Sequence, residues 1–164
     1  MINNWSKFNE FNSEESNSQV IQSIRNSLLK TLKDKIEDIR DIFVEFGDSN
    51  IIERYSCEAS QTYISCTNND FDRFISNIAY TFKPKDLYSL HSGDSKVTIG
   101  VSLYLPGKRK DNGNAILTYE SISLLEDIIV AAKRLKSSDF EVELDMNGSH
   151  RDYKPIELKI SFNI

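Results

Sequence analysis

Apolar residues recur at helical spacing between residues 18 and 46, and this pattern constrains the fold more than any other in the chain. Every third or fourth residue is apolar, which places these side chains on one face of an α-helix. They are Ile21, Ile24, Leu28, Leu32, Ile36, Ile39, Phe43 and Phe46. Gly47 follows, and glycine commonly ends a helix. The sequence therefore predicts one long amphipathic helix, which either docks on the rest of the chain or projects from it.

A strand and a second helix are predicted next. Residues 52–66 are rich in β-favouring types and alternate in polarity, which predicts a single strand. The sequence Asn68-Asn69-Asp70 offers a cap for a helix over residues 71–82, and Pro84 ends that helix. Residues 84–95 are predicted to form a loop, with turn residues at Ser92-Gly93-Asp94.

The second half of the chain adds a third helix and four strands. Ser123 and Glu126 form the pattern of a capping box, which predicts that a helix begins there. The strands are predicted from alternating polarity. They cover residues 97–105, 115–119, 139–146 and 156–164.

The predicted order of elements is α-βαββαβ-β, whose six middle members resemble the order of ferredoxin-like folds. The sequence thus predicts an α+β fold: a long N-terminal amphipathic helix followed by a ferredoxin-like antiparallel sheet, with one extra C-terminal strand at the edge beside the fourth strand. Residues 1–17 are polar apart from three aromatic residues and are predicted to be a tail. Residues 18–164 are predicted to form a single α+β domain.

Composition excludes several classes of protein. The chain of 164 residues is long enough for one hydrophobic core, and no run approaches the roughly 20 apolar residues that cross a bilayer. The N-terminus lacks the pattern of a signal peptide, so a cytoplasmic location is expected. The net charge of −5 argues against nucleic acid as the main ligand. The abundance of Asn, Ser, Ile and Lys suggests an AT-rich bacterial or phage genome.

The two cysteines indicate neither a zinc site nor a disulfide. Cys57 and Cys66 lie nine residues apart and have no histidine nearby. A zinc site needs about four ligands, usually in close pairs. We expect both residues to be buried, reduced thiols.

Acidic residues concentrate on one side of the predicted N-terminal helix. Between residues 34 and 58 the chain has eight acidic and three basic residues. The carboxylates opposite the apolar face are Asp34, Glu37, Asp38, Asp41, Glu45 and Asp48. One sign of charge suits a basic partner, because complementary charges speed encounter. The alternative is an ordinary solvated helix face.

A second acidic set lies on the predicted strand at residues 139–146. Asp139, Glu141, Glu143 and Asp145 occupy every second position, so they share one face of the strand. They form either a docking face for a basic partner or the wet face of an antiparallel sheet, balanced in part by Lys159. A hard cation such as Mg²⁺ is a third reading, but it normally needs ligands from several segments.

The remaining motifs are weak. His91 and His150 lie beside serines in predicted loops, without the strand–turn–helix context of a nucleophile. The basic run Lys108-Arg109-Lys110 has no glycine-rich phosphate loop and no interleaved aromatics, which favours a solvated hairpin tip. Four tyrosines fall on predicted strands but lack the core motif of RNA-recognition modules, and sheet packing is expected. They are Tyr55, Tyr63, Tyr104 and Tyr119.

These observations together favour a small acidic, non-enzymatic protein that binds and neutralises a basic protein partner. Immunity proteins, antitoxin-like inhibitors and phage counter-defence proteins have this role. No cofactor, metal or catalytic residue is expected, and the protein is expected to be a monomer or a homodimer through its N-terminal helix. The alternative is a small-ligand-binding or regulatory domain, with a pocket between the sheet and the first helix lined by Tyr55, Tyr63 and Tyr104.

Overall fold

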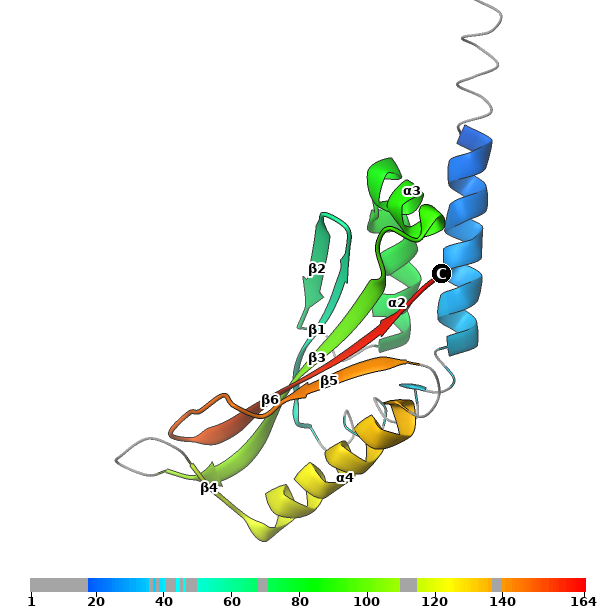
Figure 1. The fold of residues 1–164 in the computed structure, drawn as a ribbon. Helices are drawn as coiled ribbons and strands as arrows, with labels where there is room; N and C mark the ends of the chain where they lie inside the picture. The colour runs from blue at the N-terminus through cyan, green and yellow to red at the C-terminus, as the bar shows by residue number, and fades with distance from the viewer. Residues whose placement is uncertain are drawn as a thin grey trace, which may run out of the picture.

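In a computed structural model of the chain, six strands form one antiparallel sheet and four helices accompany it among the described residues (Figure 1). The structure describes residues 18–35, 37, 39, 40, 44, 46, 50–67, 71–109, 115–136 and 140–164. Several features named above therefore lie outside the described residues. They are the tail 1–17, Gly47, the cap at residues 68–70, and the carboxylates Asp38, Asp41, Glu45, Asp48 and Asp139.

The N-terminal helix packs into the core. Residues 18–35 are helical, and so are residues 37, 39, 40, 44 and 46. The described members of the predicted apolar face are buried, except Ile21, which is half-buried at the start of the helix. Its buried members are Ile24, Leu28, Leu32, Ile39 and Phe46. The ammonium of Lys35 lies 4.9 Å from the ring centroid of Phe140 and 5.5 Å from that of Phe162, so the helix docks beside the end of the sheet.

The strand predicted over residues 52–66 is a hairpin. β1 (Ile52–Ala59) turns at Ser60 and Gln61 and returns as β2 (Thr62–Cys66). Ser60 has a φ of 55°, in the left-handed region that glycine or asparagine usually occupies in tight turns. The turn was missed because Ser60-Gln61 contains neither the glycine nor the asparagine that marks a two-residue hairpin turn in a sequence.

The loop predicted at residues 84–95 contains a helix. α2 (Phe71–Thr81) ends before Pro84, as predicted, but α3 (Pro84–Ser92) begins at that proline. Proline at the first helical position has no backbone N–H to leave unpaired, and its φ suits the helix. Gly93, with a φ of 82°, ends α3.

The sheet order is β2-β1-β3-β6-β5, with the short β4 paired to β3. The remaining elements are β3 (Val97–Lys108), β4 (Ile116–Leu117), α4 (Tyr119–Lys136), β5 (Glu141–Asp145) and β6 (Tyr153–Phe162). This order differs from a ferredoxin-like sheet, and the C-terminal strand lies inside the sheet rather than at its edge. β6 has ten residues, and its alternate apolar side chains from Ile156 to Phe162 are buried, whereas β5 has five residues with only half-buried apolar side chains. The longer, more apolar strand therefore occupies the interior position.

α4 begins at Tyr119, four residues before Ser123, where the helix was predicted to begin. The Thr118 hydroxyl accepts a hydrogen bond from the backbone N–H of Ser121 (3.2 Å). The hydroxyl of Ser121, which is itself buried, donates to the carbonyl of Pro106 on β3 (2.5 Å). The N-terminal cap of α4 is thus also its attachment to the sheet.

The sheet has one covered face and one open face. Along β3, Val97, Ile99, Val101, Leu103 and Leu105 are buried and face the helices. α2 contacts β1, and α4 contacts β3 and β5. The alternate positions on each strand, polar in most cases, point to the other face, which no described helix covers. None of the described helices is both long and apolar enough to cross a bilayer.

Candidate functional site

Carboxylates gather on the open face of the sheet at its β5 edge. Glu141, Glu143 and Asp145 are exposed and occupy alternate positions of β5, as predicted. Across the strand pair they lie opposite Ser161, Lys159 and Glu157 respectively. Glu157 adds a fourth carboxylate that sequence reasoning missed. Its polar position two residues before Lys159, in the alternating stretch 156–164, was the available signal.

The charges of this acidic edge, defined as Glu141, Glu143, Asp145 and Glu157, are only partly balanced. Lys96 forms an ion pair with Glu141, and Lys159 lies 3.7 Å from Glu157 and directly opposite Glu143. No ion pair joins Glu143 or Asp145 to a basic side chain within the described part of the chain. Four carboxylates therefore face two ammonium groups, and the edge carries excess negative charge.

The described acids of the N-terminal helix and the acidic edge lie on different sides of the sheet. Asp34 and Glu37 are exposed, but their helix packs on the covered face of the sheet, whereas the β5 carboxylates point from the open face. The two predicted acidic sets are thus not joined into one face by the residues that the structure describes.

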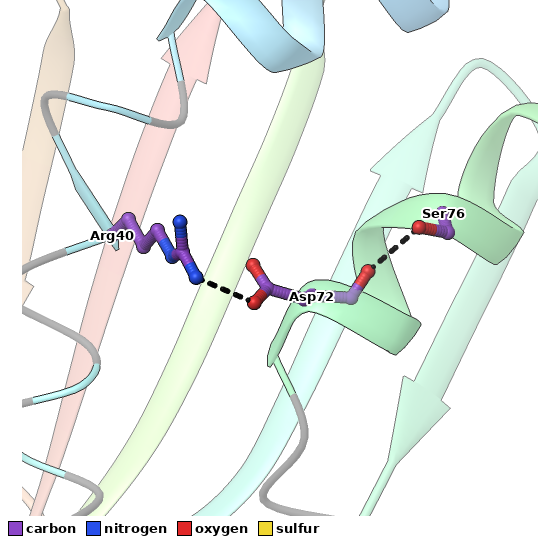
Figure 2. Close-up of polar contacts among 3 residues, drawn as sticks. All are labelled: Arg40, Asp72 and Ser76. Carbon is purple, nitrogen blue, oxygen red and sulfur yellow. Dashed lines mark hydrogen bonds and ion pairs between the residues drawn. The ribbon is translucent and has the colours of Figure 1, made fainter.

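A groove of about 500 Å³ runs between the N-terminal helix and α2. Arg40 Nη2 lies 2.9 Å from Asp72 Oδ2 across it, and the hydroxyl of Ser76 donates to the backbone carbonyl of Asp72 (Figure 2). Both partners of this ion pair are more than half exposed, so it contributes little to stability. The lining also contains Lys33 and Glu37, so charges of both signs alternate and no single ligand charge is selected.

The pocket predicted from three tyrosines is not formed. Tyr55 is buried in the core, 5.5 Å and 5.7 Å by ring centroid from Phe71 and Phe74. Tyr104 lies on the opposite face of the sheet, where its hydroxyl donates to the carbonyl of Asn50 (3.1 Å), and Tyr63 is exposed on β2. Tyr119 is the first residue of α4 rather than part of a strand, and it is 92% exposed.

Neither histidine forms a nucleophile–base pair in the described residues. His91 is exposed in the last turn of α3. The Nδ1 atom of His150 accepts a hydrogen bond from the backbone N–H of Asp152 (3.1 Å), so the neutral imidazole carries its proton on Nε2. Asp152 Oδ2 lies 3.9 Å from that Nδ1, too far for a hydrogen bond that would orient a base.

The thiols and the acidic groups offer no metal site in the part of the chain that is described. No three side chains of His, Cys, Asp or Glu come together there as ligands. Cys57 is buried, Cys66 is half-buried, and neither forms a disulfide. Burial, with a smaller contribution from the charge of Glu58, raises the pKa of Cys57 to about 12, so this thiol stays protonated.

Comparison with known proteins adds no further assignment: no family, no curated protein and no solved structure matches the chain. The fold and the site define an α+β protein with an antiparallel sheet that is open on one face and acidic at one edge.

Proposed function

We propose that this is a small acidic, non-enzymatic protein that binds and neutralises a basic protein partner. The observation that carries the proposal is the acidic edge: four carboxylates and two lysines on a sheet face that no described helix covers.

The excess of negative charge at the acidic edge favours a binding surface over an ordinary solvated sheet face. A solvated sheet face needs only polar side chains, and charges of mixed sign serve that purpose. The row on β5 consists of carboxylates alone, spaced about 7 Å apart, and this spacing matches alternate basic side chains on an extended segment of a partner. Complementary charge raises the association rate and disfavours partners of the wrong sign. β5 is also an edge strand, so its outer backbone groups have no strand partner among the described residues.

The role that fits this chemistry is that of an inhibitor. Immunity proteins, antitoxin-like inhibitors and phage counter-defence proteins are biological forms of this role. We place such a protein in the cytoplasm of a bacterial or infected cell, with a basic protein rather than nucleic acid as its main partner.

The test is affinity capture with two variants matched in charge. The first, Glu141→Gln/Glu143→Gln/Asp145→Asn, neutralises the acidic edge. The second, Glu120→Gln/Glu126→Gln/Asp127→Asn, removes three exposed carboxylates from α4 and changes the net charge equally. Each immobilised protein is exposed to lysate of the native host at low salt, and bound proteins are quantified by mass spectrometry.

We expect one basic protein to be enriched by the wild type and by the α4 variant, and depleted at least tenfold with the edge variant. High salt should release it, because the pairs are solvent-exposed. Equal capture by both variants, or no basic protein at all, would contradict the proposal.

A further inference from the structure

The end of the sheet far from the N-terminal helix carries a positive, aromatic surface within this acidic chain. Figure 1 shows the ends of β3 and β4 and the beginning of β6 projecting together from the sheet, away from α3. We call this region the tip and define it as residues 104–109, 115–117 and 147–155. Backbone hydrogen bonds from Gly107 to Asp152 (3.3 Å) and from Ala115 to His150 (2.9 Å) hold its segments together.

Basic side chains dominate the described part of the tip. Four basic residues are present against one carboxylate, Asp152. They are Lys108, Arg109, Arg151 and Lys154. Lys154 donates to the carbonyl of Gly148 (2.7 Å), and Arg109 Nε lies 3.8 Å from Asp152 Oδ1. Lys108, Arg109 and Arg151 are exposed, so they can meet an anionic ligand.

Three rings lie in a row beside these cations. His150 stacks on Tyr153 with ring centroids 4.1 Å apart, and Tyr104 meets Tyr153 edge-on at 5.7 Å. Tyr104 and Tyr153 belong to neighbouring strands and are half-buried on the open face of the sheet. The run at residues 108–110 has no aromatic residue within it, but the fold supplies aromatic rings from a different hairpin.

We propose that the tip binds single-stranded nucleic acid. Lys108, Arg109 and Arg151 contact phosphates, and the row of His150, Tyr153 and Tyr104 stacks against bases. Cations that track a backbone beside aromatic rings are the combination that such ligands require. An acidic peptide would satisfy the cations but would leave the ring row without a role.

The net negative charge of the chain does not prevent this binding. At a rise of ~3.4 Å per residue, Lys108 lies about 20 Å along the sheet from Glu157, which is the residue of the acidic edge nearest to it in strand register. The Debye length at ~0.1 M salt is about 10 Å, so phosphates beside Lys108, Arg109 and Arg151 experience mainly these cations. This inference is independent of the acidic edge and of its basic partner.

The test is fluorescence anisotropy of the full-length protein with a labelled 12-nucleotide oligodeoxythymidylate at ~0.1 M salt. A labelled 12-residue polyglutamate serves as the competing class of ligand. Lys108→Gln/Arg109→Gln/Arg151→Gln removes the phosphate contacts. Lys30→Gln/Lys133→Gln/Lys136→Gln removes three exposed lysines elsewhere and changes the net charge equally.

We expect the tip variant to bind the oligonucleotide at least tenfold more weakly, and the lysine control to stay within about twofold. The log–log salt slope of the wild type should be about −2, since each single-strand phosphate contact contributes about 0.7. Tyr153→Leu should weaken binding about fivefold or more without changing that slope. Tyr153→Phe, which keeps the aromatic ring, should bind the oligonucleotide as the wild type does. If Tyr153→Leu fails to fold, His150→Ala tests the same stacking.

Three outcomes would each overturn the proposal. The wild type fails to bind the oligonucleotide, or the tip variant and the lysine control weaken binding equally. The third is that polyglutamate binds as tightly as the oligonucleotide and the ring substitutions have no effect, in which case the tip takes acidic polypeptides instead.

Discussion

Asp86 connects three parts of the chain through a single carboxylate. It is 1% exposed, and it accepts hydrogen bonds from the backbone N–H groups of Gln61 (3.1 Å) and Lys83 (3.0 Å). The hydroxyl of Thr62 also donates to it. The same residue therefore caps α3 and holds the turn between β1 and β2, where Ser60 has its left-handed backbone.

Removal of this carboxylate should destabilise the protein clearly. We expect Asp86→Ala to lower the free energy of unfolding by about 2–3 kcal/mol, because two backbone donors and a hydroxyl lose their acceptor in a buried site. Urea denaturation at 25 °C measures the change. Asp127→Ala, on the exposed face of α4, is the control and should shift stability by less than about 0.5 kcal/mol. Equal effects of the two substitutions would show that Asp86 has no such role.

The same carboxylate should make stability depend on pH. Burial raises the pKa of Asp86, but the hydrogen bonds from Thr62, Gln61 and Lys83 and the charge of Lys83 outweigh burial, so its pKa lies below the usual 3.8. A lowered folded-state pKa stabilises the protein above the unfolded value, and that contribution is lost as the pH falls through the folded value. The free-energy gap between wild type and Asp86→Asn should therefore be constant near neutrality and shrink as the pH falls below about 4. A gap that widens on acidification would contradict this.

Among the elements, α4 begins where its hydrogen bonds place it and not where the local sequence pattern predicted. The pair Ser123 and Glu126 has the spacing of a capping box, yet Thr118 supplies the cap and Ser121 ties it to Pro106. That second bond joins residues 15 apart. A sequence pattern confined to four residues does not detect it.

Two alanine substitutions distinguish these alternatives. Thr118→Ala should lower the free energy of unfolding by about 1 kcal/mol, the usual loss on removal of an N-terminal cap. Ser123→Ala, at an exposed helix position, should change it by less than about 0.5 kcal/mol or stabilise slightly. Thermal or urea unfolding of both variants measures these losses. A larger loss for Ser123→Ala than for Thr118→Ala would show that Ser123 is the cap.

Other elements show where prediction from sequence succeeds and where it stops. The alternation over residues 97–105 correctly predicted which side chains of β3 are buried, because period-two patterns specify faces. The same pattern in residues 156–164 predicted a strand but not its neighbours, since alternation carries no information about which strand lies alongside. The acidic residues on β5 were predictable because alternation along one strand specifies which side chains share a face. The position of Glu157 beside them and the ring row at the tip depend instead on strand register.

At the scale of the whole molecule, the described charges separate along the sheet. The acidic edge begins near the N-terminal helix, and the basic tip lies at the opposite end of β6. A net charge of −5 averages over both regions and describes neither. Two ligands of opposite charge can therefore be bound at separate places on one sheet.

The role of the acidic edge is tested by the association rate constant between the protein and its captured basic partner, measured by stopped flow against salt concentration. We expect Glu141→Gln/Glu143→Gln/Asp145→Asn to slow association about tenfold or more at ~0.02 M salt, and the difference from the wild type to vanish toward ~0.5 M. The matched substitutions of Glu120, Glu126 and Asp127 on α4 should slow it about twofold at most. Equal slowing by both variants would show that only the net charge matters and that the acidic edge is not the binding surface.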